Sequence, residues 1–101
     1  MILDQFKLKL FEYAKAKDQN RLDVLRFFLA QVKNKEIEMR PQGVELNDEH
    51  VYKALKKLTK QVDETIETCK KANRAETLVK TEREKAILHE FMEIFPNELK
   101  S

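Results

Sequence analysis

The residues that could do chemistry in this 101-residue chain are few and scattered. Histidine occurs only at His50 and His89, far apart in the sequence, and the single cysteine is Cys69. Nucleophilic catalysis needs a nucleophile beside a base that a third group holds in place, and neither histidine has such a motif around it. Cys69 falls on an apolar helical seam, so we expect it to be a packed core thiol. We therefore predict no catalytic residue.

Signatures of metal and cofactor sites are also missing from the sequence. Metal sites on helices use pairs such as Glu-x-x-His or His-x-x-x-His, and the chain has neither. His89 and Glu93 are four residues apart, a spacing that favours a surface hydrogen bond over a metal site. The single glycine, Gly43, is too little to build a Gly-rich phosphate loop. We predict no metal and no cofactor.

A cluster of lysines is the one local asymmetry of charge, and its members are Lys53, Lys56, Lys57 and Lys60. Like charges four residues apart cost roughly a few tenths of a kcal/mol per pair in an isolated helix. One interpretation is a solvated helix face that neighbouring acids compensate. The sharper interpretation is a basic patch that contacts phosphates, with Arg74 nearby. No aromatic residue lies between these lysines, so stacking of bases is not expected.

Composition indicates one helical domain. Charged residues make up 38% of the chain, above the usual level of about 25%, while the hydrophobic share of 42% supports a core. One glycine and two prolines leave few turn-formers and so favour few, long elements. The net charge of +2 does not by itself demand a nucleic-acid partner. A lone thiol, with no signal peptide and no apolar run of membrane-spanning length, predicts a cytoplasmic protein without a membrane partner.

Apolar residues at helical spacing predict four helices, over residues 2–17, 21–39, 48–72 and 76–95. Asn47 is a good N-cap for the third helix, but His50 stands where a capping box has Glu or Gln, so no full box is expected. The expected apolar stripes are Leu3, Phe6, Leu10 and Tyr13 or Ala14; Leu22, Leu25, Phe28, Leu29, Val32 and Ile37; Val51, Leu55, Leu58, Val62, Ile66 and Cys69; and Leu78, Ala86, Leu88, Phe91, Ile94 and Phe95.

Short amphipathic helices are stable only when they bury their stripes against one another. We therefore predict an all-α fold: a single four-helix bundle-like domain of two antiparallel helical hairpins, the first two helices forming one hairpin and the last two the other. Pro96 should end the fourth helix, and residues 97–101 should be a frayed polar tail.

Several short motifs resemble the YqeY family, in order and over nearly the whole chain. They are Tyr13 to Arg26, Val32 to Glu38, Leu46 to Val51, Leu55 to Gln61, Lys71-Ala72-Asn73-Arg74, and Ile94-Phe95-Pro96, which stands where the family usually has Tyr-Leu-Pro. The chain departs from the pattern at Val62, where the family commonly has Arg, and runs about three residues longer between Arg74 and Pro96. The resemblance implies that residues 1–101 are the family's N-terminal helical domain, without the C-terminal tail domain, so the chain is either a fragment or a truncated member.

The family is related to the helical and tail regions of the B subunit of the transfer-RNA-dependent amidotransferase, which converts glutamate charged on glutamine transfer RNA into glutamine. The resemblance thus implies a non-catalytic accessory to that carbon–nitrogen ligase system, with transfer RNA or amidotransferase subunits as partners. The contact residues expected on this reading are Lys57, Lys60, Gln61 and Arg74, the cations meeting phosphates and Gln61 donating a hydrogen bond.

An alternative is a protein-interaction module that binds no RNA. Its hydrophobic groove would receive a partner, either the absent tail or a second copy in self-association. Phe27 is the cue, because it lies beside the main stripe of its helix. If exposed, it would mark a docking surface, and if buried it would belong to the core.

Overall fold

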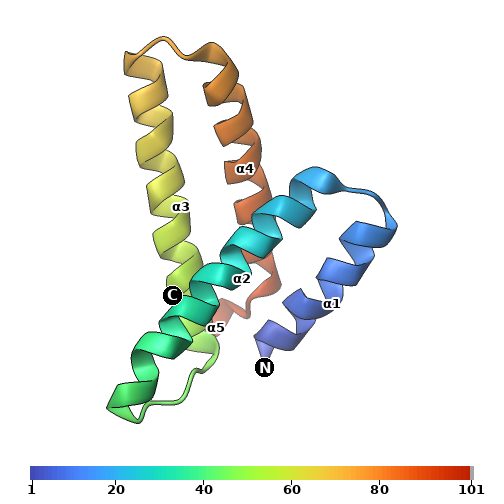
Figure 1. The fold of residues 1–101 in the computed structure, drawn as a ribbon, viewed down its shortest axis with the longest axis vertical. Helices are drawn as coiled ribbons and strands as arrows, with labels where there is room; N and C mark the ends of the chain where they lie inside the picture. The colour runs from blue at the N-terminus through green and yellow to red at the C-terminus, as the bar shows by residue number, and fades with distance from the viewer. Residues whose placement is uncertain (101) are drawn as a thin grey trace.

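The computed structural model describes residues 1–100, and helices are their only regular secondary structure (Figure 1). The elements are α1 (Ile2–Lys15), α2 (Gln19–Met39), a 3-10 turn η1 (Arg40–Gln42), α3 (Asp48–Lys71), α4 (Ala75–Ile94) and α5 (Asn97–Lys100). Each of the four long helices ends within two residues of its predicted limits.

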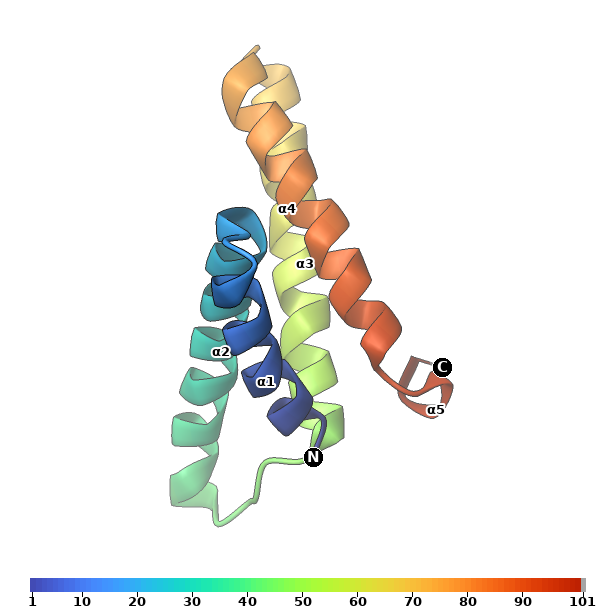
Figure 2. The ribbon, with the colours of Figure 1, turned by 90° about the vertical axis from the view of Figure 1, so that its right-hand side faces the viewer.

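The predicted pair of antiparallel hairpins is confirmed (Figure 1). α1 pairs with α2, α3 pairs with α4, and α2 packs against both helices of the second hairpin. The far end of the α3–α4 hairpin projects beyond the first hairpin, as the side view in Figure 2 shows. The part of the molecule where three or more helices meet is therefore the end near α5 and the N-terminus.

Three of the helical segments end in the same backbone arrangement. Lys17, Gly43 and Asn73 have φ angles of 57°, 68° and 55°, in the left-handed region. After α1, the Lys17 N–H donates to the Ala14 carbonyl and the Asp18 N–H to the Tyr13 carbonyl, the paired bonds of a Schellman motif. The same pattern after α3 reverses the chain within residues 72–74. Both hairpins therefore have very short connections.

The start of α3 corrects the expectation of an incomplete cap. The His50 N–H donates to Asn47 Oδ1 at 3.0 Å, and the Asn47 N–H donates to His50 Nδ1 at 3.1 Å. The imidazole thus takes the place of the Glu or Gln carbonyl oxygen in a full capping box. A capping box is usually recognised by a carboxylate or amide acceptor, whereas a neutral histidine also has one acceptor nitrogen.

The core centres on four phenylalanines. The Phe6 ring lies 5.2 Å from Phe28 and 5.6 Å from Phe91, both nearly edge to face, and 5.5 Å from Phe95. Such pairs contribute about 0.5–1.5 kcal/mol beyond the burial of their area. Phe6 therefore joins α1 to α2 and to the end of α4 in one buried cluster.

The predicted stripe of α3 is confirmed in full, because all six of its members are buried. The stripes of the other helices need correction. Ala86 and Ile37 are exposed, while Ile87 and Met39, absent from the predicted stripes, are buried. Polar residues from Lys80 to Lys85 interrupt the apolar period of α4, so the sequence pattern left its inner face ambiguous.

The C-terminal segment also differs from the prediction of a frayed tail. Residues 97–100 form the single turn α5, in which Leu99 packs partly buried against the core. Lys100 Nζ lies 3.6 Å from Glu93 Oε2 and ties this turn to α4. The burial of Leu99 and this ion pair both hold the segment against the core, and Ser101 lies outside the described residues.

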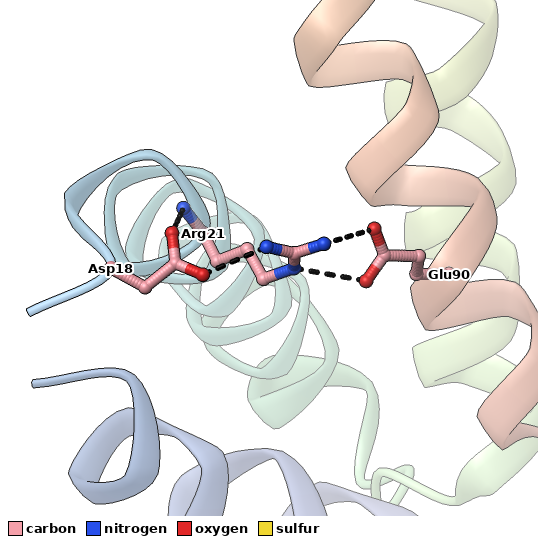
Figure 3. Close-up of polar contacts among 3 residues, drawn as sticks. All are labelled: Asp18, Arg21 and Glu90. Carbon is pink, nitrogen blue, oxygen red and sulfur yellow. Dashed lines mark hydrogen bonds and ion pairs between the residues drawn. The ribbon is translucent and has the colours of Figure 1, made fainter. Parts of the chain in front are cut away.

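An ion network fixes the start of α2 against α4 (Figure 3). Arg21 Nε and Nη2 donate to the two carboxylate oxygens of Glu90 at 2.9 and 2.7 Å, and Nη1 donates to Asp18 Oδ2 at 2.8 Å. Asp18 also caps α2 by accepting the Arg21 N–H. The planar guanidinium matches a carboxylate in two parallel bonds, so this contact ties the start of α2 to α4.

Candidate functional site: a polar groove between α2 and α3

Two polar stripes face each other where the second half of α2 passes the first half of α3. Between them lies a hollow of about 380 Å³, which we call the polar groove. Its walls are Gln31, Asn34, Lys35 and Glu38 from α2 and His50, Lys53, Ala54, Lys57, Leu58 and Gln61 from α3. The α2 residues recur at the three- and four-residue spacing that places side chains on one helix face.

The charge of the polar groove is positive, because Lys35, Lys53 and Lys57 face a single carboxylate, that of Glu38. Lys53 pairs with Glu49 on its own helix at 3.3 Å. Within residues 1–100, Lys35 and Lys57 have no ion pair or hydrogen bond to another side chain. Their ammonium groups are therefore available to an anion from outside the chain.

His50 adds a donor to this groove. Its Nδ1 accepts the Asn47 N–H, so the neutral ring carries its proton on Nε2. Gln31, Asn34 and Gln61 add side-chain amides to the same walls. Ammonium, imidazole and amide donors in one groove suit hydrogen bonding to phosphate and sugar oxygens.

The structure separates the four predicted contact residues. Lys57 and Gln61 line the polar groove together, whereas Lys60 is exposed on α3 and does not line it. Arg74 is the N-cap of α4 at the tip of the second hairpin. A helix rises about 1.5 Å per residue, so the end of α3 next to this tip lies roughly 20 Å from Lys57. Arg74 is therefore not part of the groove.

Sequence reasoning missed half of the site, the α2 wall. Gln31, Asn34, Lys35 and Glu38 carry a readable signal, polar residues at positions i, i+3, i+4 and i+7 of a helix. On its own, such a stripe is typical of a solvated face. Only the passage of α2 beside α3 turns it into one wall of a groove.

The groups with shifted titration lie elsewhere. Burial raises the pKa of Tyr13, the hydrogen bond from Arg21 lowers the pKa of Asp18, and the bonds to Glu90 and Asp18 raise the pKa of Arg21. All three residues lie around the α1–α2 connection, where the Arg21 network accounts for the shifts of Asp18 and Arg21 and burial for that of Tyr13. Perturbed titration here marks a structural ion network and not a reactive centre.

Cys69 is a free, buried thiol, as predicted for a core residue. Within residues 1–100, no three His, Cys, Asp or Glu side chains gather closely enough to hold a metal ion. Over the same residues, every helix is too short or too polar to cross a lipid bilayer.

A second hollow, of about 260 Å³, lies on the same flank of α2 but beside its first half, and we call it the apolar groove. It is lined by Asn20, Asp23, Val24 and Phe27 of α2, Leu58 and Val62 of α3, and Lys80, Arg83, Glu84, Ile87 and Leu88 of α4. Leu58 belongs to both grooves. Phe27 is 54% exposed, so it does not belong to the core.

Comparison with known families identifies the family to which the chain belongs. A family profile described as Yqey-like protein matches residues 3–101, which is almost the entire chain. The chain belongs to this family. Among curated proteins, none matches the chain significantly. In this Yqey-like chain, most of the polar-groove residues fall within the sequence segments that carry the resemblance, 32–38, 46–51 and 55–61.

Proposed function

We propose that the chain is a non-catalytic, RNA-contacting module that acts as an accessory to the transfer-RNA-dependent amidotransferase system. The observation that carries the RNA part is the polar groove, whose lysines outnumber its single acid, Glu38, and in which Lys35 and Lys57 form no ion pair within residues 1–100. Phosphate contacts supply most of the sequence-independent affinity for nucleic acids. The link to the amidotransferase system is supported by the family relationship alone.

The groove favours contact with the RNA backbone over reading of bases. Its donors are lysines, amides and the His50 imidazole, and no Phe, Tyr or Trp lines its walls. Backbone contacts position a protein on RNA without reading sequence. We therefore expect this module to bind transfer RNA by charge and shape, with little preference for sequence.

Fluorescence anisotropy of labelled transfer RNA, titrated with the full chain at several salt concentrations, tests this proposal. Each lost phosphate contact should lower the slope of log affinity against log salt by about one. The double variant Lys35→Gln/Lys57→Gln should therefore bind more weakly than the wild type and lose a slope of about two. A matched control is Lys7→Gln/Lys15→Gln, because both residues are exposed on α1.

Single variants locate the contact more sharply. If the groove is the site, Lys57→Gln should weaken binding more than Lys60→Gln, which changes the same charge on the adjacent face of α3. Equal losses would indicate diffuse attraction to the helix as a whole. Binding that does not respond to salt, or an unaltered affinity in the double groove variant, would refute the proposed function.

Protein interaction without RNA is the second candidate function, and the exposed ring of Phe27 in the apolar groove favours it. The two functions use different surfaces. A chain that binds no transfer RNA but loses a protein contact on substitution of Phe27 would support this alternative.

A further inference from the structure

The apolar groove has the form of a binding site for an aromatic side chain. Leu58 and Val62 of α3 line it together with residues of α2 and α4. A cavity of about 150 Å³ is enough to hold a benzene ring in a protein interior, and this groove has about 260 Å³. Phe27 stands at its edge with 54% of its surface exposed. The groove could thus hold an aromatic ring, and the Phe27 ring beside it is exposed to water.

The charges around the groove are divided between its two sides. The α2 side carries Asp23, whereas the α4 side carries Lys80 and Arg83 with one acid, Glu84. Within residues 1–100, Lys80 and Arg83 form no ion pair with any acid. The rim therefore offers an acidic side and a free basic side on one patch.

A patch with both signs and both a ring and a hollow is complementary to itself. In a two-fold dimer the same surface patch of each copy forms the interface. If one residue of the first copy contacts a second residue of the other copy, the reverse contact also forms. The α2 side of one copy would then lie on the α4 side of the other, so that Asp23 meets Lys80 and Arg83 twice. A rim with both signs of charge does not favour a ligand of either net charge. In this respect the apolar groove differs from the polar groove, which is positive.

We propose that the occupant of the apolar groove is a second copy of this chain, in a two-fold dimer that seats each Phe27 ring in the groove of the other copy. This pairing removes both exposed rings from water and compensates both free basic sides. It leaves the polar groove, with Lys35 and Lys57, outside the contact. The dimer does not depend on RNA binding.

Sedimentation velocity of the full chain over a range of concentrations tests the pairing. The wild type should shift from monomer to dimer as concentration rises. Phe27→Ala should raise the dissociation constant at least tenfold, whereas the control Phe11→Ala should leave it unchanged, because Phe11 is 74% exposed on α1. A helical circular dichroism spectrum in each variant establishes that the monomer is folded.

Charge exchange tests the two-fold geometry itself. Asp23→Arg and Arg83→Asp should each weaken self-association, because like charges then meet at both contacts. Mixing the two variants should restore dimers, since each contact again joins opposite charges. A wild type that stays monomeric at the highest concentration would overturn the proposal. So would equal dimerisation of the two phenylalanine variants, or mixed variants that fail to associate.

Discussion

Arg21 shows how one side chain ties two helices together at their surface. Its guanidinium bonds both oxygens of Glu90 on α4 and one oxygen of Asp18 at the start of α2 (Figure 3). Exposed ion pairs contribute only about 0–1 kcal/mol, and the Arg21 side chain is 38% exposed. The value of this network therefore lies in direction, because a fork with two parallel bonds allows few relative positions of α2 and α4.

Asp18 makes that network sensitive to acid. The side-chain hydrogen bond from Arg21 holds the pKa of Asp18 below its ordinary value, so folding favours the charged carboxylate. The stability that this charge contributes is present above the unfolded pKa of about 3.9 and is lost as pH falls through the lower, folded pKa. Asp18→Asn keeps a good N-cap but removes the charge. It should therefore be less stable than the wild type at neutral pH, and the difference should shrink below about pH 4.

Urea denaturation of both proteins between neutral pH and pH 2.5 measures that difference. The Arg21→Gln background is the control, because there the main cause of the shift is gone and the Asp18→Asn effect should depend little on pH. A wild-type advantage that persists undiminished in strong acid would contradict the assignment.

The sequence predicts which residue types form the polar groove better than it predicts which residues meet there. Lys57 and Gln61 lie together in the polar groove, as proximity in the sequence and helical spacing allow. Lys35 could not be predicted as their neighbour, because no sequence rule states where α2 passes α3. Arg74 was grouped with them from its nearness in the sequence and from the family resemblance of Lys71-Ala72-Asn73-Arg74, and the length of α3 places it at the hairpin tip, away from the groove.

Among the elements, the helix ends show the clearest tension between residue and conformation. Lys17 adopts a left-handed φ that glycine adopts without steric cost, and that costs other residues about 1–2 kcal/mol. Asn73 tolerates the same region better, and Gly43 is already glycine. The end of α1 is thus held by its Schellman hydrogen bonds against the preference of its residue.

Lys17→Gly should stabilise the protein by roughly 1 kcal/mol, since it removes that steric cost. Gly43→Ala should destabilise it by a similar amount, because alanine is disfavoured at a φ of 68°. The added Cβ would meet no other part of the chain within 4 Å, so the loss comes from φ alone. The midpoint of urea denaturation, with an unchanged slope, measures both.

Lys7→Gly is the matched control for the gain at Lys17. Lys7 is exposed inside α1, where glycine costs about 1 kcal/mol relative to a good helix former. Glycine should therefore raise stability at one lysine of the α1 segment and lower it at the other. A loss at both positions would mean that the backbone at Lys17 is not left-handed.

The helices were predictable to different degrees for a physical reason. The α3 seam recurs at intervals of three or four residues among mostly polar neighbours, so its inner face is unambiguous, and every predicted member is buried. In α4 the inner face includes Thr81, whose hydroxyl donates to the Thr77 carbonyl at 2.7 Å. A polar residue that satisfies itself within its helix can be buried, and a hydrophobicity pattern does not reveal it.

Across the whole molecule, one buried cluster unites the two hairpins. Phe6 is fully buried and touches rings of α2 and of the α4 end. Phe6→Ala should lower the free energy of unfolding by about 3–5 kcal/mol, as expected for a large core side chain. Since both hairpins share this cluster, unfolding should remain a single transition.

Denaturation followed by circular dichroism measures this loss. Phe11→Ala is the control, because an exposed ring should change stability by about 0.5 kcal/mol or less. Two separate transitions in the wild type would show that the hairpins fold independently.

One flank of α2 lines both grooves, with Leu58 of α3 between them. Two chains joined through the apolar groove would carry their lysine-lined surfaces on one body, and such a body is bivalent. An RNA long enough to touch both surfaces would meet the second at a high effective concentration, and its avidity would exceed that of a short oligonucleotide. The length at which affinity rises would then report how far apart the two copies hold their lysines.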